Sequence, residues 1–245
     1  GDFNLTGRAP WNSGSTRYYE FWGDNLVFQT SNHVGSGVGS DSNFASSVSN
    51  RLINEGSIGF KVGDQGTWGL TGYYNAITYT GNVIDSLYTI SGNQGFLNPG
   101  LFPYGGATSQ TTATAGAHPS AFYTNSVLRG TGAMLPVQTG TRRDIVGGNF
   151  KYLWNDWTVT GAFRHEHKEG SLEDSFYGSF NGSSFALPID YDTDRYDVSA
   201  AYSSRLYQAV LQYTFSHFTD NNLFVTLPYP FANTAKPYQE AAAYS

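Results

Sequence analysis

Residues 141–168 read TRRDIVGGNFKYLWNDWTVTGAFRHEHK, and they show the clearest structural pattern in the chain. Before the turn Asn155-Asp156, the side chains of Val146 and Phe150 fall on one face of an extended chain, whereas Lys151 falls on the other. After the turn the alternation resumes at once. Side chains alternate with a period of two in a β-strand, and an apolar face opposite a polar face is typical of strands that line a membrane barrel. The stretch predicts one hairpin of a transmembrane β-barrel.

The same alternation recurs in other segments. Ile58 and Phe60 alternate with Lys61, and Tyr196 alternates with Asp197. Aromatic residues beside the short turns are expected at the membrane interface. The residues expected to face lipid or form this aromatic girdle are Trp68, Phe150, Trp154, Trp157, Phe163, Tyr202, Tyr207 and Tyr213. The residues expected to face the enclosed interior and a partner are Lys61, Arg143, Asn149, Lys151, Arg164, Glu166, Arg195 and Asp197.

The composition supports a barrel. Only 13% of the 245 residues are charged, against about 25% in a typical soluble domain. No apolar run approaches the roughly 18 residues of a transmembrane helix. Because only helices and closed barrels satisfy the backbone in lipid, a membrane protein of this composition must be a barrel. We therefore predict an all-β fold, a transmembrane antiparallel up-and-down β-barrel in the outer membrane of a Gram-negative bacterium.

Composition also excludes several functions. The chain has no cysteine, which excludes disulfides, thiolate metal sites and covalent haem attachment on this chain. The net charge is −6 without a basic cluster, which argues against a nucleic-acid partner. Serine, histidine and aspartate residues are present, but no nucleophile elbow or triad spacing is recognisable. We therefore expect no enzymatic activity, no cofactor bound by this chain and no catalytic residue.

The order of the segments predicts short turns on one side of the membrane and long loops on the other. We expect about eight or nine strands, with a second long connection running from Glu169 to about Asp190. The expected layout is irregular N-terminal strands and a Gly/Ser-rich loop over 1–55, a hairpin over 56–80, a long loop over 81–140, hairpins over 141–168 and 191–220, and a loop with the start of another strand over 221–245. The loop over 81–140 is a lumenal plug, a partner-docking loop or an extracellular cover.

The chain ends inside a predicted strand, and a barrel cannot leave a strand edge unpaired in lipid. Either the last strand is frayed and the first closes against the one before it, or the barrel is larger and this is its N-terminal part. We favour the larger barrel. The chain opens on Gly-Asp-Phe without a signal peptide, as a mature form or a piece of a longer protein would.

Several long segments resemble one family. They are TRRDIVGGNFKYLWNDWTVTGAFRHEHKEG, FALPIDYDTDRYDVSAAYSSRLYQAVLQYTFSHFTDNN, LPYPF and WGLTGYYNAITYTGNVIDSLYTI. Their sequence and order are similar to the MtrB/PioB family of outer-membrane barrels, and the similarity is densest from about Gly56 to Ser245. This resemblance implies a sheath for electron transfer across the outer membrane. The barrel would enclose a periplasmic multihaem c-type cytochrome and dock an extracellular one, and these partners would carry the haem.

Two rival functions share the same periodicity. A water-filled porin or solute channel would have the same strands, and the family resemblance alone favours the sheath. A soluble or surface-exposed β-rich adhesin would have to place Trp154, Trp157, Tyr202 and Tyr207 beside turns that face water.

Histidine and aspartate residues near the predicted outer rim raise the question of a metal site. His165 and His167 share the face of Phe163. Two imidazoles without a third ligand favour an interfacial rim over a metal or haem site. Asp190, Asp192 and Asp194 have the spacing of the first ligands of a calcium loop. The sixth position, Arg195, and the twelfth, Ala201, exclude an EF-hand. A calcium site at the rim and a solvated acidic loop remain the alternatives.

The residues between the histidines also have two interpretations. Arg164, Glu166 and Lys168 alternate with His165 and His167. They either dock a cytochrome or form an ion-paired ladder that stabilises the interior wall.

Overall fold

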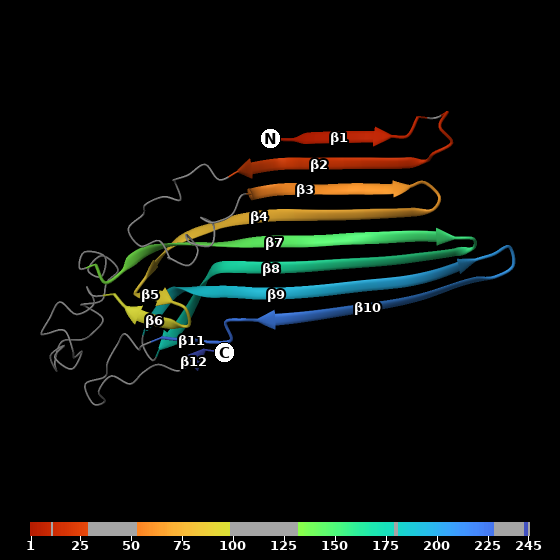
Figure 1. Ribbon diagram of the computed structural model, residues 1–245. Helices are drawn as coiled ribbons and strands as arrows, with labels where there is room; N and C mark the ends of the chain where they lie inside the picture. The colour runs from red at the N-terminus through yellow and green to blue at the C-terminus, as the bar shows by residue number, and fades with distance from the viewer. Residues whose placement is uncertain (11, 29–52, 99–131, 179–180, 228–242, 245) are drawn as a thin grey trace, which may run out of the picture.

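The computed structural model describes residues 1–10, 12–28, 53–98, 132–178, 181–227 and 243–244, and these residues form β-strands, turns and connections. No helix in these ranges is long and apolar enough to cross a membrane. Eight strands form one antiparallel sheet in the order β1-β2-β3-β4-β7-β8-β9-β10 (Figure 1). Their bounds are β1 Phe3–Arg8, β2 Arg17–Phe28, β3 Ile53–Asp64, β4 Trp68–Ser86, β7 Leu135–Trp154, β8 Trp157–Gly178, β9 Asn181–Ser203 and β10 Gln208–Asp220.

The register of the sheet gives it one apolar and one polar face. Residues paired side by side across strands lie on the same face. One row that crosses the sheet is Leu5, Phe21, Phe60, Gly72, Gly148, Phe163, Tyr196 and Phe215. The neighbouring row on the other face is Thr6, Glu20, Lys61, Thr71, Asn149, Ala162, Asp197 and Thr214. In this register, the two rows hold opposite kinds of side chain on the two faces across all eight strands.

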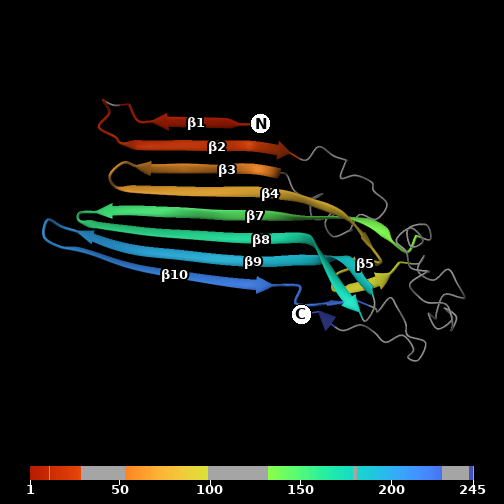
Figure 2. The ribbon, with the colours of Figure 1, turned by 180° about the vertical axis from the view of Figure 1, so that it is seen from behind.

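The short turns lie together at one end of the sheet, and the long connections depart from the other (Figure 2). The predicted turn Asn155-Asp156 joins β7 to β8, and Asn155 adopts a φ of +52° there. Trp154 and Trp157 form the last cross-strand pair before this turn, and Trp157 lies 5.1 Å from Tyr202 between ring centroids. Trp154 is 62% exposed. These aromatic rings therefore lie on the apolar face beside the turns, where a girdle is expected.

The opposite ends of the strands are longer than the sequence pattern predicts. The connection predicted over 81–140 contains the end of β4 and the start of β7, and the one predicted from Glu169 to Asp190 consists mainly of β8 and β9. The run Phe185–Ile189 shows the reason, because four of its five residues are buried. Strands covered on both faces do not alternate, so period two is lost.

A second, smaller sheet covers these strand ends. It consists of β5 Tyr88–Ser91, β6 Gln94–Leu97, β11 Val225–Thr226 and β12 Ala243–Tyr244, in the order β12-β11-β6-β5. Tyr88 and Phe185 pack edge to face in a dry cluster with Leu87, Val225 and Leu227. The β8–β9 hairpin stops pairing with β7 at Ser171 and turns out of the main sheet (Figures 1 and 2).

This turn depends on Gly170. Its φ is +135°, and a Cβ atom there would lie 2.3 Å from the backbone oxygen of Gly140. Only glycine adopts this backbone without strain.

The N-terminal region is more regular than predicted. The sequence predicts irregular strands before the Gly/Ser-rich loop, but β2 is one continuous strand from Arg17 to Phe28, and β1 pairs with it. A bulge between Asp24 and Val27 interrupts the pairing with β3, and Asn25 has a φ of +51°. The bulge adds one residue to β2, so the side chains after it fall on the opposite face from the one that the alternation before it predicts. In the sequence pattern, one continuous strand therefore resembles two short strands.

β1 and β10 are the two edges of the main sheet, and each pairs with a neighbour on one side only. The barrel is therefore not closed within the described residues. Closure in lipid requires backbone pairing along both of these edges.

Lysine in place of Phe163 places a charge in the middle of the apolar face. We expect Phe163→Lys to destabilise the folded barrel by about 2–4 kcal/mol, because a basic side chain near the bilayer midplane has no hydration there. Ala162→Lys is the matched control, since its neighbours on the polar face are Asn149 and Asp197. Heat-modifiable gel migration shows whether each variant is folded, and urea titration in lipid measures its free energy of unfolding. Equal stability of the two would contradict the assignment of faces.

Gly56 supports the β2 bulge from the next strand. Its φ is +122°, and a Cβ atom would lie 2.5 Å from the backbone oxygen of Asn25. We expect Gly56→Ala to lower stability by about 1–3 kcal/mol through backbone strain. Gly161→Ala is the control, because nothing lies within 4 Å of its added Cβ. Urea titration of both variants gives the comparison, and a Gly56→Ala midpoint equal to that of the wild type would show that the bulge tolerates a side chain.

Candidate functional site

The polar face of the main sheet contains all eight residues that the sequence predicts for the interior. The register places them on alternate positions of β3, β7, β8 and β9. Arg143 Nε lies 2.9 Å from Glu166, and Arg164 Nη2 lies 2.6 Å from the same carboxylate. Arg195 binds Asp197 through two nitrogens, and Thr214 donates to Asp197 at 2.7 Å. One ion pair thus joins β7 to β8, and one side-chain hydrogen bond joins β10 to β9, along the same face.

Two lysines on this face differ from the arginines. Lys61 and Lys151 are exposed and have no carboxylate partner among the described residues. Lys61 Nζ lies 5.8 Å from the ring centroid of Tyr18 on the same face. These two ammonium groups are therefore available to an anionic group that approaches the polar face.

The predicted lipid-facing residues lie on the opposite face. Trp68, Phe150, Trp154, Trp157, Phe163, Tyr202 and Tyr213 belong to its rows. Tyr207 precedes β10 in the turn closed by Ser204 and is 72% exposed.

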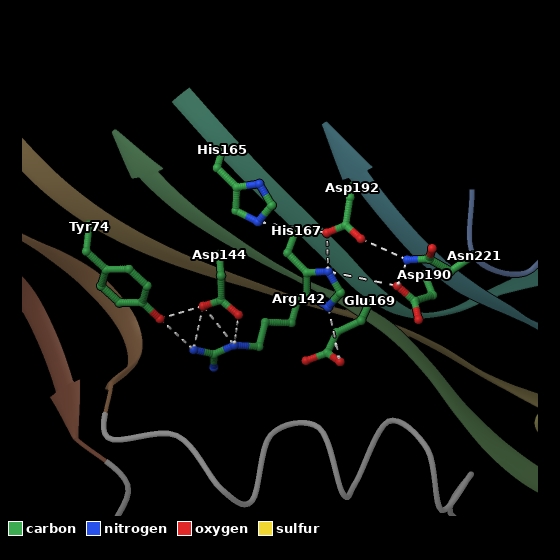
Figure 3. Close-up of polar contacts among 9 residues, drawn as sticks. All are labelled: Tyr74, Arg142, Asp144, His165, His167, Glu169, Asp190, Asp192 and Asn221. Carbon is green, nitrogen blue, oxygen red and sulfur yellow. Dashed lines mark hydrogen bonds and ion pairs between the residues drawn. The ribbon is translucent and has the colours of Figure 1, made fainter. Parts of the chain in front are cut away.

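Further along this same face, beyond Phe163, the rows hold polar residues, and Figure 3 shows the contacts of several of them. Successive rows above Phe163 place His165 beside Asp194, His167 beside Asp192, and Glu169 beside Asp190. His165 Nδ1 and Asp194 Oδ1 are 2.8 Å apart, as are His167 Nδ1 and Asp192 Oδ1. We call these three cross-strand pairs the rim ladder.

Asn221, directly after β10, completes the rim ladder. Its Nδ2 donates to Asp190 Oδ1 at 2.9 Å and to Asp192 Oδ2 at 2.8 Å. Its backbone N–H donates to the backbone oxygen of Asp190 at 2.8 Å. Asp190, Asp192 and Asp194 therefore lie on β9, and the predicted solvated loop is replaced by a paired strand. The two histidines therefore have carboxylate neighbours. These neighbours come from the adjacent strand through the register, so the spacing of residues in the sequence does not reveal them.

A buried ion pair that was not predicted from the sequence adjoins the rim ladder. Arg142 is fully buried and binds Asp144 through Nε and Nη2, at 3.0 and 2.9 Å. Tyr74 donates to Asp144 at 2.5 Å, and Arg142 Nη2 donates to the backbone oxygen of Ile53 at 2.6 Å. The sequence does contain a sign of this pair. Arg142 and Asp144 are an even number of residues from Val146, so they lie on the same, apolar face of the strand. This cluster fastens the first residue of β3 to β4 and β7.

A long-stranded antiparallel sheet with one lipid-compatible face, one polar face and an aromatic girdle is the wall of a transmembrane β-barrel. Comparison with known families agrees: the model for outer-membrane β-barrel porins, MtrB/PioB, matches residues 33–245. The chain belongs to the MtrB/PioB family. It is a β-barrel protein of the outer membrane. No curated protein matches the sequence.

Removing one member of the buried ion pair takes away the opposite charge that the other member binds. We expect Arg142→Met to destabilise the barrel by about 3–5 kcal/mol, because Asp144 then lacks its cation. The double variant Arg142→Met/Asp144→Leu removes both charges and should recover part of the loss. Urea titration of the single and double variants in lipid measures the effect. Equal destabilisation by both would mean that the buried charge is not the cause.

Proposed function

We propose that the barrel wall formed by this chain sheathes a periplasmic multihaem c-type cytochrome, docks an extracellular one, and so supports electron transfer across the outer membrane. The observation that carries the proposal is membership of the MtrB/PioB family, together with the cytochrome association that the family resemblance implies. In this role the barrel is structural and non-catalytic.

The polar face suits such a partner. Haem propionates and the polar surface of a cytochrome are costly to bury in hydrocarbon, and side chains that form hydrogen bonds remove that cost. The arginines of the polar face are largely paired with Glu166 and Asp197, whereas Lys61 and Lys151 offer ammonium groups to a propionate or an acidic surface. A cytochrome needs a lumen much wider than that of an eight-stranded barrel, whose interior its own side chains fill.

Haem belongs to the partner in this proposal. Covalent c-type haem attachment requires cysteine, and the chain contains none. The chain would therefore act by positioning the cytochrome and excluding lipid from it.

A water-filled porin is the second candidate, and the family's description as a porin favours it. The same polar face would then line an aqueous channel. The two functions differ in what fills the lumen, and this difference is measurable.

Purification of the full-length barrel in mild detergent tests the sheath. We expect haem absorbance to co-elute with the barrel and conductance in planar bilayers to be low, because the cytochrome occupies the lumen. A haem-free barrel that conducts ions freely would refute the sheath and support the porin.

Charge reversal on the polar face tests the contact directly. We expect Lys61→Glu/Lys151→Glu to lower the retained haem per barrel several-fold, with a larger loss at low ionic strength, because the added carboxylates repel propionates. Arg205→Glu, in the turn between β9 and β10, is the control. Haem-to-barrel absorbance ratios measure the result, and an unchanged ratio in the double variant would remove these lysines from the contact.

A further inference from the structure

We propose that the rim ladder contains a binding site for a first-row divalent transition metal ion, with His167, Asp190 and Asp192 as its ligands. These three side chains each offer one donor atom, and the three atoms lie within 4.8 Å of one another. The site lies on the apolar face, at the end of the sheet from which the long connections depart. The residues of the proposed cytochrome contact lie on the other face. The metal site can therefore be tested independently of the proposed function.

The separations are close to those of a metal site. His167 Nδ1 lies 2.8 Å from Asp192 Oδ1 and 3.9 Å from Asp190 Oδ1. Two bonds of about 2.1 Å that meet at about 90–110° hold their donor atoms roughly 3.0–3.4 Å apart. The observed distances lie on either side of this range, and a metal ion at the site would replace the hydrogen bond between His167 and Asp192.

The charge of the cluster also favours a cation. Within the described part of the chain, the ion-pair partners of Asp190 and Asp192 are histidines alone. Two carboxylates thus lie close together without a lysine or arginine between them, and Asn221 holds them there by donating to both. Like charges repel at this distance, and a divalent ion converts the repulsion into attraction.

The surroundings match the support that metal ligands have in proteins. A histidine that binds metal through one ring nitrogen usually donates the other N–H to a carboxylate, and ligating carboxylates are themselves hydrogen-bonded. Glu169 Oε2 lies 3.6 Å from His167 Nε2, the nitrogen that faces away from Asp192, which is an ion-pair separation longer than a hydrogen bond. Asn221 supplies the hydrogen bonds to the carboxylates. The three ligand side chains are partly exposed, between 24% and 39%, so an ion has access to them.

The donor set selects the class of metal. Imidazole favours zinc, iron, nickel and copper, whereas calcium and magnesium prefer oxygen ligands alone. One imidazole and two carboxylates therefore favour Zn²⁺ or Fe²⁺ over Ca²⁺. The site differs from the calcium loop considered above because its geometry comes from the register of β8 and β9.

Equilibrium dialysis with Zn²⁺ tests the site on the full-length barrel, purified in detergent with its bound partners and stripped by a chelator. Excess Ca²⁺ and Mg²⁺ in the buffer occupy unspecific carboxylate sites. We expect the wild type to hold one more Zn²⁺ per barrel than Asp192→Asn, and His167→Gln to weaken the binding by at least about tenfold. Asp156→Asn, in the exposed turn between β7 and β8 at the opposite end of the sheet, is the control and should bind like the wild type.

The outcomes are distinct. Heat-modifiable migration shows that each variant is folded, so a loss of Zn²⁺ is not a loss of the barrel. Wild-type binding equal to that of Asp192→Asn would overturn the site. Unchanged Zn²⁺ binding in His167→Gln, or displacement of Zn²⁺ by the excess Ca²⁺, would overturn the assignment of an imidazole ligand and of the metal class.

Discussion

Lateral hydrogen bonding between strands determines both the register and the two faces of this sheet. A backbone N–H or C=O left unpaired in hydrocarbon costs several kcal/mol, so every strand in the membrane must pair with both neighbours. Pairing fixes the register, and a slip of one residue would exchange the two faces. The row through Phe60, Phe163 and Tyr196 and the row through Lys61, Ala162 and Asp197 keep opposite chemistry only because this register is held.

The two faces of each strand can be predicted from the sequence, because the alternation of side chains depends only on neighbouring residues in the chain. The hairpin over 141–168 has its predicted turn and faces, and so do the strands around Phe60 and Tyr196. Prediction fails where a strand is covered on both sides, as at Phe185–Ile189, because burial there comes from β5, β6 and β11 rather than from neighbours in sequence. It also fails at Asn25, where a bulge shifts the alternation.

For the candidate sites, too, local features could be predicted from the sequence and contacts between strands could not. The face of each charged residue follows from its parity, which is how Lys61, Arg164 and Asp197 are assigned from sequence. Which residues become neighbours depends on the pairing of strands. His167 and Asp192 are 25 positions apart, and nothing in their local sequence relates them. Arg142 and Asp144 lie two apart, so their shared face could have been predicted, but the carbonyl of Ile53 that completes their contacts could not.

The height of the rim ladder in the membrane explains why such charges are tolerated on the apolar face. Trp157 marks the turn-side girdle, and His165 follows eight residues later on β8. A strand that rises about 3.3 Å per residue and is tilted by about 40° gains roughly 20 Å over that distance, against an apolar band about 25 Å tall. On this estimate His165 lies inside the band close to its outer edge, His167 lies at that edge, and Glu169 lies beyond it in the headgroup region. Charged groups there retain water and can exchange ions, whereas the same groups beside Phe163 would be desolvated. The apolar face thus changes chemistry where the membrane ends, while the polar face keeps its charged residues through the full depth.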